Sequence, residues 1–319
     1  MKKRVIKAIV CLVVCCSWSQ AQRLDESQAP SEVRKVLGQL RLAIETEKLN
    51  FTVAYNPAHR YTIAQLCGLR VAKAGDWWRQ AKERNLLKLK PVTLKSGALG
   101  AGLPAVWDWR LHDGVTPVKD QGGCGSCWAF GSIGALESLL AIKSDTLVDL
   151  SEQQLVSCNS LGYGCGGGWW AFDMLINPGA VLETDFPYVA ADVACGGPYA
   201  YPFKLSGWAY VDGDDQVAAT DKLKQAIYTY GPAAAAVYVG AAFQAYSSGV
   251  FDKDELPGGG LFSCSPSSDV NHAILLVGWD DGKGAWILRN SWGPGWGESG
   301  YMYIKYGINN VGFAATCVY

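Results

Sequence analysis

The sequence is poor in the groups that most metal and membrane functions need. Only three of its 319 residues are histidine, His59, His112 and His272, and they lie far apart in the chain. Three scattered imidazoles do not make a ligand set, so we expect no metal and no cofactor. After residue 21, no segment approaches the roughly 18 uninterrupted apolar residues of a transmembrane helix. We therefore expect a mature protein that does not span a membrane.

The N-terminus has the pattern of a secretory signal peptide. A basic start, MKKRVIK, precedes a short apolar stretch at residues 8–14 and the small residue Ala21. This stretch is too short to cross a membrane, so we predict a signal peptide at residues 1–21. Cys15 and Cys16 would also allow lipidation, but Val14 is not the small residue that this processing needs.

The most informative segment is QGGCGSCWAF, residues 121–130. It places Cys127 after a glycine-rich turn and at the start of an apolar run, residues 128–142, with the spacing of a buried helix. A thiol at a helix N-terminus lies at the positive end of the helix dipole, which favours the nucleophilic thiolate. The alternative is that Cys124 and Cys127 form a structural disulfide or a C-x-x-C metal or redox pair.

A cysteine nucleophile needs a base, and His272 is the best candidate. It begins HAILLVGW, which reads as a buried strand, and follows Cys127 by 145 residues. Asn290 ends a second strand, WILRN, and Trp292 lies two residues further on. An asparagine orients an imidazole by hydrogen bonding, and an indole shields that bond from water. A lone histidine beside an apolar strand is usually structural, but this spacing favours a catalytic role.

Together these segments resemble the papain family of cysteine peptidases. The signature C-G-[SA]-C-[WY], with His and Asn about 130–150 residues later, is typical of that family. The match runs from about residue 103 to residue 312, through LPAVWDWR, VTPVKDQGGCGSCWAF, LSEQQLVSC, GCGGG, NHAI and NSWG. The resemblance implies hydrolysis of peptide bonds through an acyl-thioester intermediate.

The resemblance also implies catalytic roles. Cys127 would be the nucleophile, and His272 its general base and acid, the two resting as thiolate and imidazolium. Asn290 would orient His272. Gln121 would supply the side-chain N–H of the oxyanion hole and Cys127 the backbone N–H, donors worth about 2.7–4 kcal/mol each in the transition state.

Substrate binding is implied at a further set of positions. Gly167 and Gly168 match a glycine pair that binds the substrate backbone as an added strand, although they could also form a turn beside Cys165. The binding set also includes Gly125 and Trp292. The S2 pocket would be lined by Trp169, Trp170, Ala236, Val270 and Thr316. Since no acid lies among these residues, we predict an apolar or aromatic P2 residue.

Seven of the eleven cysteines lie in residues 103–319. Besides Cys127 this leaves six, the even number of a disulfide framework, which fits secretion or an oxidising lysosome-, vacuole- or periplasm-like compartment. The family pattern implies the pairs Cys124 with Cys165 and Cys158 with Cys195. For Cys264 the expected partner is Cys317.

The charges divide the chain in two. Residues 22–102 hold 14 Lys and Arg against 7 Asp and Glu, whereas residues 103–319 hold 10 against 22. A basic segment before an acidic body is typical of an electrostatically docked inhibitor, and SGALGAG at residues 96–102 reads as a cleavable linker. We therefore predict a pro-segment at residues 22–102 with a helix at residues 34–44. A separate basic binding module is the alternative.

Part of the pro-segment, FTVAYN and QLCG, resembles the shorter pro-segments of cathepsin B-like enzymes. The body has no histidine between His112 and His272, so the paired histidines of the cathepsin B occluding loop are missing. Endopeptidase activity is therefore expected rather than dipeptide removal. The sequon at Asn50 would matter only in a eukaryotic secretory pathway.

The expected fold is α+β, with two lobes and the active-site cleft between them. Residues 103–210 would form a helical lobe that holds Cys127, with a second helix beginning at the cap Ser151. Residues 211–319 would form an antiparallel, β-barrel-like lobe that holds His272.

Other functions use the same residues. An exopeptidase or a transpeptidase is possible on this scaffold, and a catalytically silent binding homologue is disfavoured because Cys127, His272 and Asn290 are all present. The expected partners are peptide substrates, the chain's own pro-segment and cystatin-like inhibitors. The acidic body would repel phosphate, so no nucleic acid is expected.

Overall fold

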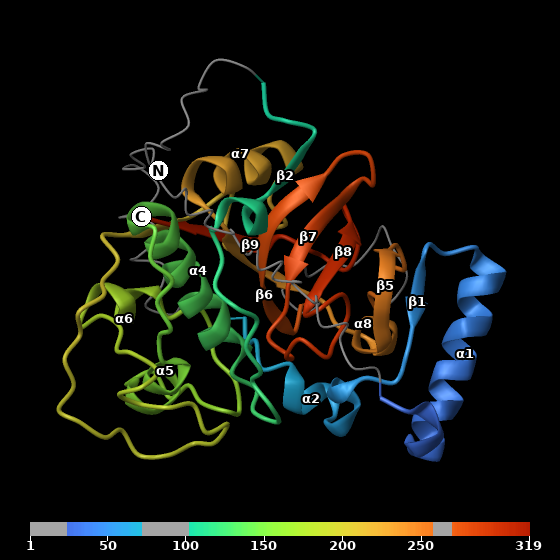
Figure 1. Ribbon diagram of the computed structural model, residues 1–319, viewed down its shortest axis with the longest axis horizontal. Coiled ribbons are helices and arrows are strands. Elements are labelled where there is room, and N and C mark those ends of the chain that lie inside the picture. The colour runs from blue at the N-terminus through green and yellow to red at the C-terminus, as the bar shows by residue number, and fades with distance from the viewer. Residues whose placement is uncertain (1–23, 72–101, 258–269) are drawn as a thin grey trace, which may run out of the picture.

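The computed structural model describes residues 24–71, 102–257 and 270–319. The predicted signal peptide, most of the predicted linker and Cys264 lie outside these ranges. Figure 1 shows a helical lobe on the left, a twisted sheet in the centre and the N-terminal segment along the right and lower sides. No helix within the described ranges is long and apolar enough to span a bilayer.

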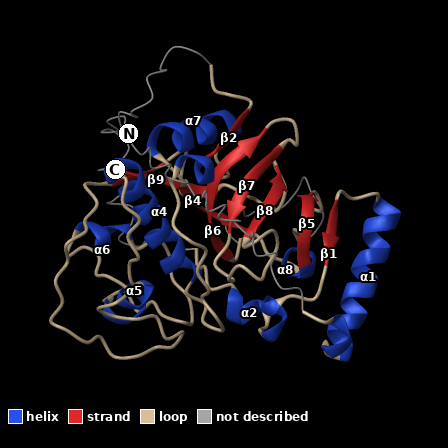
Figure 2. Cartoon of the chain, in the orientation of Figure 1, coloured by secondary structure: helices blue, strands red, loops and turns tan. Residues whose placement is uncertain are grey.

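The helical lobe is built around α4, and its other helices are α5 and α6. Helix α4 (Cys127–Ser144) is buried along most of its length because apolar and small residues cover all its faces. Helices α5 (Glu152–Cys158) and α6 (Phe172–Ile176) are short, and loops make up much of the rest of the lobe (Figure 2). The expected helix at residues 128–142 is therefore confirmed.

Local sequence signals for this lobe are also confirmed. The hydroxyl of Ser151 caps α5 by accepting a hydrogen bond from the backbone N–H of Gln154 at 3.0 Å. The two disulfides implied by the family pattern are present, Cys124–Cys165 and Cys158–Cys195. Both hold the loops that surround α4 and α5.

Within the described residues the sheet has nine strands, of which eight follow the order β1-β5-β8-β7-β6-β4-β9-β3, while β2 pairs with β6. All pairs are antiparallel except β5 with β8. The order does not close, so the expected barrel-like lobe is an open sheet. The strands are β1 (Phe51–Val53), β2 (Val106–Asp108), β3 (Trp208–Tyr210), β4 (Ala233–Val237), β5 (Tyr246–Phe251), β6 (His272–Asp280), β7 (Ala285–Arg289), β8 (Tyr301–Lys305) and β9 (Phe313–Val318).

Strand β6, in the middle of the sheet, is the strand on which the helical lobe packs. Its residues are buried almost without interruption, as expected of a strand covered on both faces, and α4 packs against it. Helices α7 (Thr220–Tyr230) and α8 (Ala241–Ala245) accompany the sheet. Strands β2 and β3 also belong to this sheet, although the sequence placed both in the helical half of the chain.

The third predicted disulfide involves Cys264, which lies outside the described residues, so this pair stays a prediction. Its expected partner, Cys317, lies on β9 as a buried free thiol. The sulfur of Cys317 lies 3.7 Å from the backbone carbonyl oxygen of Ala209 on the adjacent strand β3. The side chain is thus enclosed beside its neighbouring strand.

The described part of the N-terminal segment docks on the sheet. It contains η1 (Glu26–Gln28), α1 (Ser31–Glu47), η2 (Pro57–Arg60) and α2 (Ile63–Leu66), and β1 extends the sheet by pairing with β5 (Figure 1). The predicted helix at residues 34–44 lies within α1.

The described part of the segment is held by strand pairing, hydrogen bonds and an ion pair. The amide of Gln244 donates hydrogen bonds to the carbonyls of Ala58 and Tyr61, at 3.1 and 3.0 Å. Within the described ranges, Lys253 of the body forms an ion pair with Glu47 of the segment. Half of the basic residues on which the prediction of electrostatic docking rests lie in residues 72–101, outside the described ranges, so that docking stays a prediction.

Candidate active site

Cys127 is the first residue of α4 and is completely buried. Burial raises the pKa of its thiol to about 11, although backbone N–H groups of Ala273, Gly68 and Trp128 act in the opposite direction. Ala273 directly follows His272, so this contact brings the predicted nucleophile to the predicted base. Gly68 belongs to the N-terminal segment, which therefore covers the thiol.

His272 begins β6, and Asn290 directly follows the neighbouring strand β7. The Nε2 atom of His272 lies 2.8 Å from Oδ1 of Asn290. Because an amide oxygen only accepts, we assign the proton to Nε2, which leaves Nδ1 as the basic nitrogen. Nδ1 has no hydrogen-bond partner within the described ranges. The ring centroids of Trp292 and His272 lie 4.9 Å apart, so the indole packs beside the imidazole.

While the N-terminal segment covers the site, which we call the covered form, burial favours the neutral forms of Cys127 and His272. Burial lowers the pKa of His272 to about 4, against the smaller opposing effects of the Asn290 side chain and the Leu66 carbonyl. The raised pKa of the thiol and the lowered pKa of the imidazole therefore favour a neutral pair in this form, because separating charge away from water is costly. The resting pair of thiolate and imidazolium stays a prediction for the site once the segment has left.

Acidification is expected to weaken the cover over the site. His272 gains its proton only near pH 4 in the covered form, whereas an exposed imidazole gains it near pH 6.5. Between these values the open form binds more protons, so the free energy that favours the covered form falls as the pH falls. The protection factor of the amides at residues 66–70, which is the intrinsic exchange rate at each pH divided by the observed rate, should therefore fall from pH 6.5 to pH 4 in a Cys127→Ala zymogen that cannot cleave itself.

Burial also lowers the pKa of His59, so this second histidine could contribute to the same pH dependence and has to be removed as a control. A Cys127→Ala, His59→Gln variant removes that second group. The part of the pH dependence due to His272 should persist in it. Protection factors that do not change between pH 6.5 and pH 4 in either variant would contradict the assignment.

Gln121 is buried and held by the other lobe. Its Oε1 accepts a hydrogen bond from the hydroxyl of Ser291 at 2.7 Å, and its backbone N–H donates to the carbonyl of Ser291 at 2.8 Å. Its Nε2 donates to the carbonyls of Leu66 and Cys124, both at 2.8 Å. Nε2 therefore donates both to the N-terminal segment and to the loop before Cys127, and its role as an oxyanion donor stays a prediction. Sequence reasoning missed Ser291, although it quoted the NSWG segment that contains it.

Residues 66–70 of the N-terminal segment run through the site. Gly168 donates its backbone N–H to the carbonyl of Gly68 at 2.9 Å and accepts from the N–H of Arg70 at 2.8 Å. Leu69 donates its N–H to the carbonyl of Asn271, the residue before His272, at 3.0 Å. The segment therefore pairs with Gly168 as an added strand, in parallel orientation.

The glycines of the predicted binding set differ in their contacts. Gly168 pairs with the segment, whereas Gly167 exchanges backbone hydrogen bonds with Gly164 in a turn. Gly167 has a φ of +117°, which favours glycine. A Cβ atom on Gly125 would lie 2.6 Å from the carbonyl oxygen of Cys165, so the backbone packs closely there. Of the two interpretations of this glycine pair, the added strand therefore applies to Gly168 and the turn to Gly167.

The predicted S2 residues lie in the interior. The indole N–H of Trp169 donates to the hydroxyl of Tyr210 and that of Trp170 to the carbonyl of Ala314, each at 3.2 Å. Ala236 and Val270 are buried, and the Thr316 hydroxyl donates to the carbonyl of Ala234 at 3.2 Å. The hydrogen bonds of Trp169, Trp170 and Thr316 give these side chains structural roles, and the S2 pocket stays a prediction.

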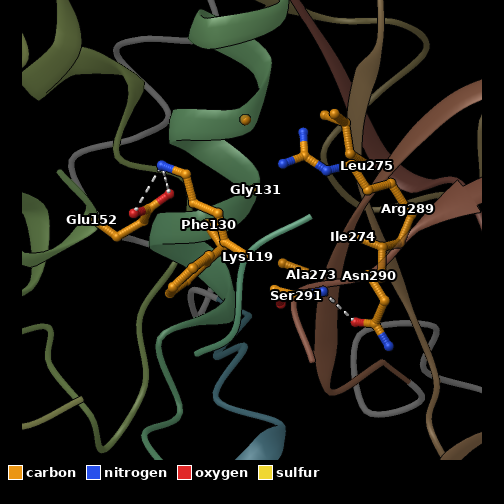
Figure 3. Close-up of a pocket in the computed structure, with 11 residues that line it drawn as sticks. Lys119, Phe130, Gly131, Glu152, Ala273, Ile274, Leu275, Arg289, Asn290 and Ser291 are labelled. Carbon is orange, nitrogen blue, oxygen red and sulfur yellow. Dashed lines mark hydrogen bonds and ion pairs between the residues drawn. The ribbon is translucent and has the colours of Figure 1, made fainter. Parts of the chain in front are cut away.

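A small cavity of about 20 Å³ lies between the lobes, next to the catalytic residues (Figure 3). Phe130 and Gly131 of α4 line one side, and Ala273 and Arg289 line the other. The volume holds about one water molecule, so this is no substrate pocket. No cluster of His, Cys, Asp and Glu in the described part of the chain is arranged to hold a metal ion.

The fold and the site define the class of protein. A helix N-terminus in one lobe presents the thiol to an imidazole on the sheet of the other, which serves acyl transfer through a cysteine nucleophile. The chain belongs to the papain family, since the model described as "Papain family cysteine protease" matches residues 103–319.

Relatives and solved structures agree. The "Probable cysteine protease RD21C" of Arabidopsis thaliana is 42% identical over 219 residues, which cover 66% of this chain and 45% of the relative. Cathepsin K of Gallus gallus is 40% identical over 208 residues, covering 63% of this chain and 58% of the relative. The match spans about half the length of these curated relatives.

The N-terminal segment also has structural counterparts. Digestive procathepsin L 3 of Tenebrio molitor larval midgut gives a TM-score of 0.70 at 30% identity, covering 90% of this chain and 88% of that one. The bromelain protease of Ananas comosus, in complex with the E64 inhibitor, gives 0.58 at 34% identity, with 68% and 99% covered. The first match extends well beyond residues 103–319, as expected for a zymogen.

Proposed function

We propose that the chain is the zymogen of a secreted cysteine endopeptidase with Cys127 as its nucleophile. The observation that carries this proposal is the passage of residues 66–70 through the site. Their backbone takes hydrogen bonds from Gln121 and Gly168, two of the groups that a peptide substrate would use. The peptide there is the chain's own, so the site is full until this segment leaves.

The catalytic steps follow from the positions of the groups. Once water and substrate enter, Nδ1 of His272 takes the thiol proton, and the sulfur of Cys127 attacks the scissile carbonyl carbon. The N–H donors of Gln121 and Cys127 stabilise the oxyanion. His272 then gives its proton to the leaving amine as the C–N bond breaks. It next takes a proton from the water that hydrolyses the thioester and returns it to the thiol.

The substrate preference is inferred from the pro-segment. Leu69 pairs with Gly168 and is only 7% exposed, so the region beside Gly168 accepts an apolar side chain. A charged side chain buried there would lose its hydration without gaining a partner. The P2 preference should therefore be apolar or aromatic.

Fluorogenic peptides that differ only at P2 test this preference on the processed enzyme. The kcat/KM should be about 100-fold higher for Leu or Phe than for Arg at P2, a difference of roughly 2.7 kcal/mol. Peptides that vary only at P1 serve as the control and should differ much less. Equal cleavage of the Arg and Leu peptides would rule out the preference.

Secretion is supported by the two disulfides. Both lie in the helical lobe, and such bonds persist in oxidising compartments. The described residues therefore fit an extracellular, lysosome-like or periplasmic location.

A further inference from the structure

Tyr188 carries a hydrogen-bond chain that reaches both the oxyanion loop and helix α4. Its hydroxyl donates to the backbone carbonyl of Gln121 at 2.9 Å and lies 2.6 Å from Oγ of Ser126. Since the phenol has one proton and Gln121 takes it, the hydroxyl of Ser126 donates to Tyr188. The carbonyl oxygen of Cys124 is a second, longer acceptor for the Ser126 hydroxyl, at 3.4 Å. Ser126 and Gln121 are completely buried and Tyr188 is partly buried, so the two ends of these hydrogen bonds that face the site are shielded from water.

Ser126 is the N-cap of α4, directly before Cys127. A serine there usually accepts a hydrogen bond from an N–H of the first helical turn. Ser126 makes no such side-chain bond; its backbone carbonyl instead accepts from the N–H groups of Ala129 and Phe130, at 2.8 and 3.2 Å. The N–H of Trp128 is left for the sulfur of Cys127.

The position of the Tyr188 ring is itself fixed. It packs edge-on against Phe130 of α4, with ring centroids 5.0 Å apart at 87°. Its backbone N–H donates to Oε1 of Glu183 at 2.7 Å. The hydroxyl is thus presented to the site by groups on α4 and on its own loop.

We propose that Tyr188 is a positioning residue for acyl transfer that acts on the oxyanion donor and the nucleophile through one hydroxyl. It holds the backbone of Gln121, whose side chain Ser291 holds from the other lobe. It also draws the Ser126 hydroxyl away from the first amides of α4, which stay available to the sulfur. This inference rests on the proposed peptidase function.

Tyr188→Phe tests the proposal, because it keeps the ring and removes the hydroxyl. In the processed enzyme, kcat per titrated active site should fall about tenfold while KM changes less than about twofold, since the oxyanion forms only in the transition state. The pH profile of Cys127 alkylation should also shift upward, because the released Ser126 hydroxyl can cap α4. A Tyr188→Phe, Ser126→Ala double variant has no Ser126 hydroxyl to cap α4, so its alkylation profile should return to that of the unaltered enzyme. Its kcat should stay low, because the hydrogen bond from Tyr188 to Gln121 is still missing.

Tyr199→Phe is the matched control. Tyr199 stacks on Phe186 in the same lobe, and the change should alter neither readout. If Tyr188→Phe lowers only the melting temperature, with kcat and the alkylation profile unchanged, Tyr188 is merely structural and the proposal is wrong. If the unaltered enzyme does not hydrolyse peptides, the proposed function fails, and the alkylation profiles still show whether Tyr188 acts on Cys127.

Discussion

A Cys127→Ala variant is expected to hydrolyse peptides at least about 10⁴-fold more slowly than the processed enzyme, because no other group can form the thioester. His272 and Asn290 meet at 2.8 Å without any contribution from the Cys127 side chain, so the variant should keep its fold. The measurement is kcat with a fluorogenic peptide, supported by the melting temperature. Substrate should still bind with a similar affinity, since the change removes a reacting atom and leaves the pairing at Gly168.

Cys317 provides the matched control for that variant. It is the other free cysteine in the described part of residues 103–319 and is buried on β9, whereas Cys127 begins α4. Cys317→Ala should retain full activity per folded molecule. If the Cys317 variant lost hydrolysis while the Cys127 variant kept it, the nucleophile would be assigned wrongly.

Gly68→Ala is expected to open the zymogen. A Cβ atom on Gly68 would lie 1.7 Å from the carbonyl oxygen of Gly125, so the segment could not keep its path. Overpacking typically costs about 1–3 kcal/mol, and the shift would also break the hydrogen bonds to Gly168. Labelling of Cys127 by an epoxide thiol inhibitor at pH 7 should therefore be about 100-fold faster in this zymogen.

Gly38→Ala is the control for the same segment. Gly38 lies in α1, and a Cβ atom there would meet nothing within 4 Å. The change should leave labelling as slow as in the unaltered zymogen and stabilise α1 by about 0.5–1 kcal/mol. Equal labelling rates for the Gly68 and Gly38 variants would show that close packing at Gly68 does not hold the segment in place.

The sequence predicted the parts of the site whose signals are local. Cys127 follows its turn, and Asn290 and Trp292 follow a strand, so chain order alone indicated their roles. Ser291 and Tyr188 act through hydrogen bonds across more than 60 residues of chain, and their types, a serine and a tyrosine, carry no specific signal. Only the fold brings them to Gln121.

The errors about the fold have a similar origin. The residues of β2 and β3 carry strand signals, but their pairing with β6 and β9 depends on distant partners. The pairing of β1 with β5 likewise joins residues far apart in the chain, and charge counts do not show which groups meet.

The central claim is that Cys127 is the nucleophile of a peptidase that residues 66–70 keep silent. It is tested most directly by following epoxide labelling of Cys127 and hydrolysis of a fluorogenic Phe-Arg peptide in one sample as the pro-segment is removed. We predict that both are negligible in the zymogen and rise together, and that full labelling abolishes hydrolysis. Hydrolysis that continues after complete labelling of Cys127, or full labelling with the segment still in place, would contradict the account.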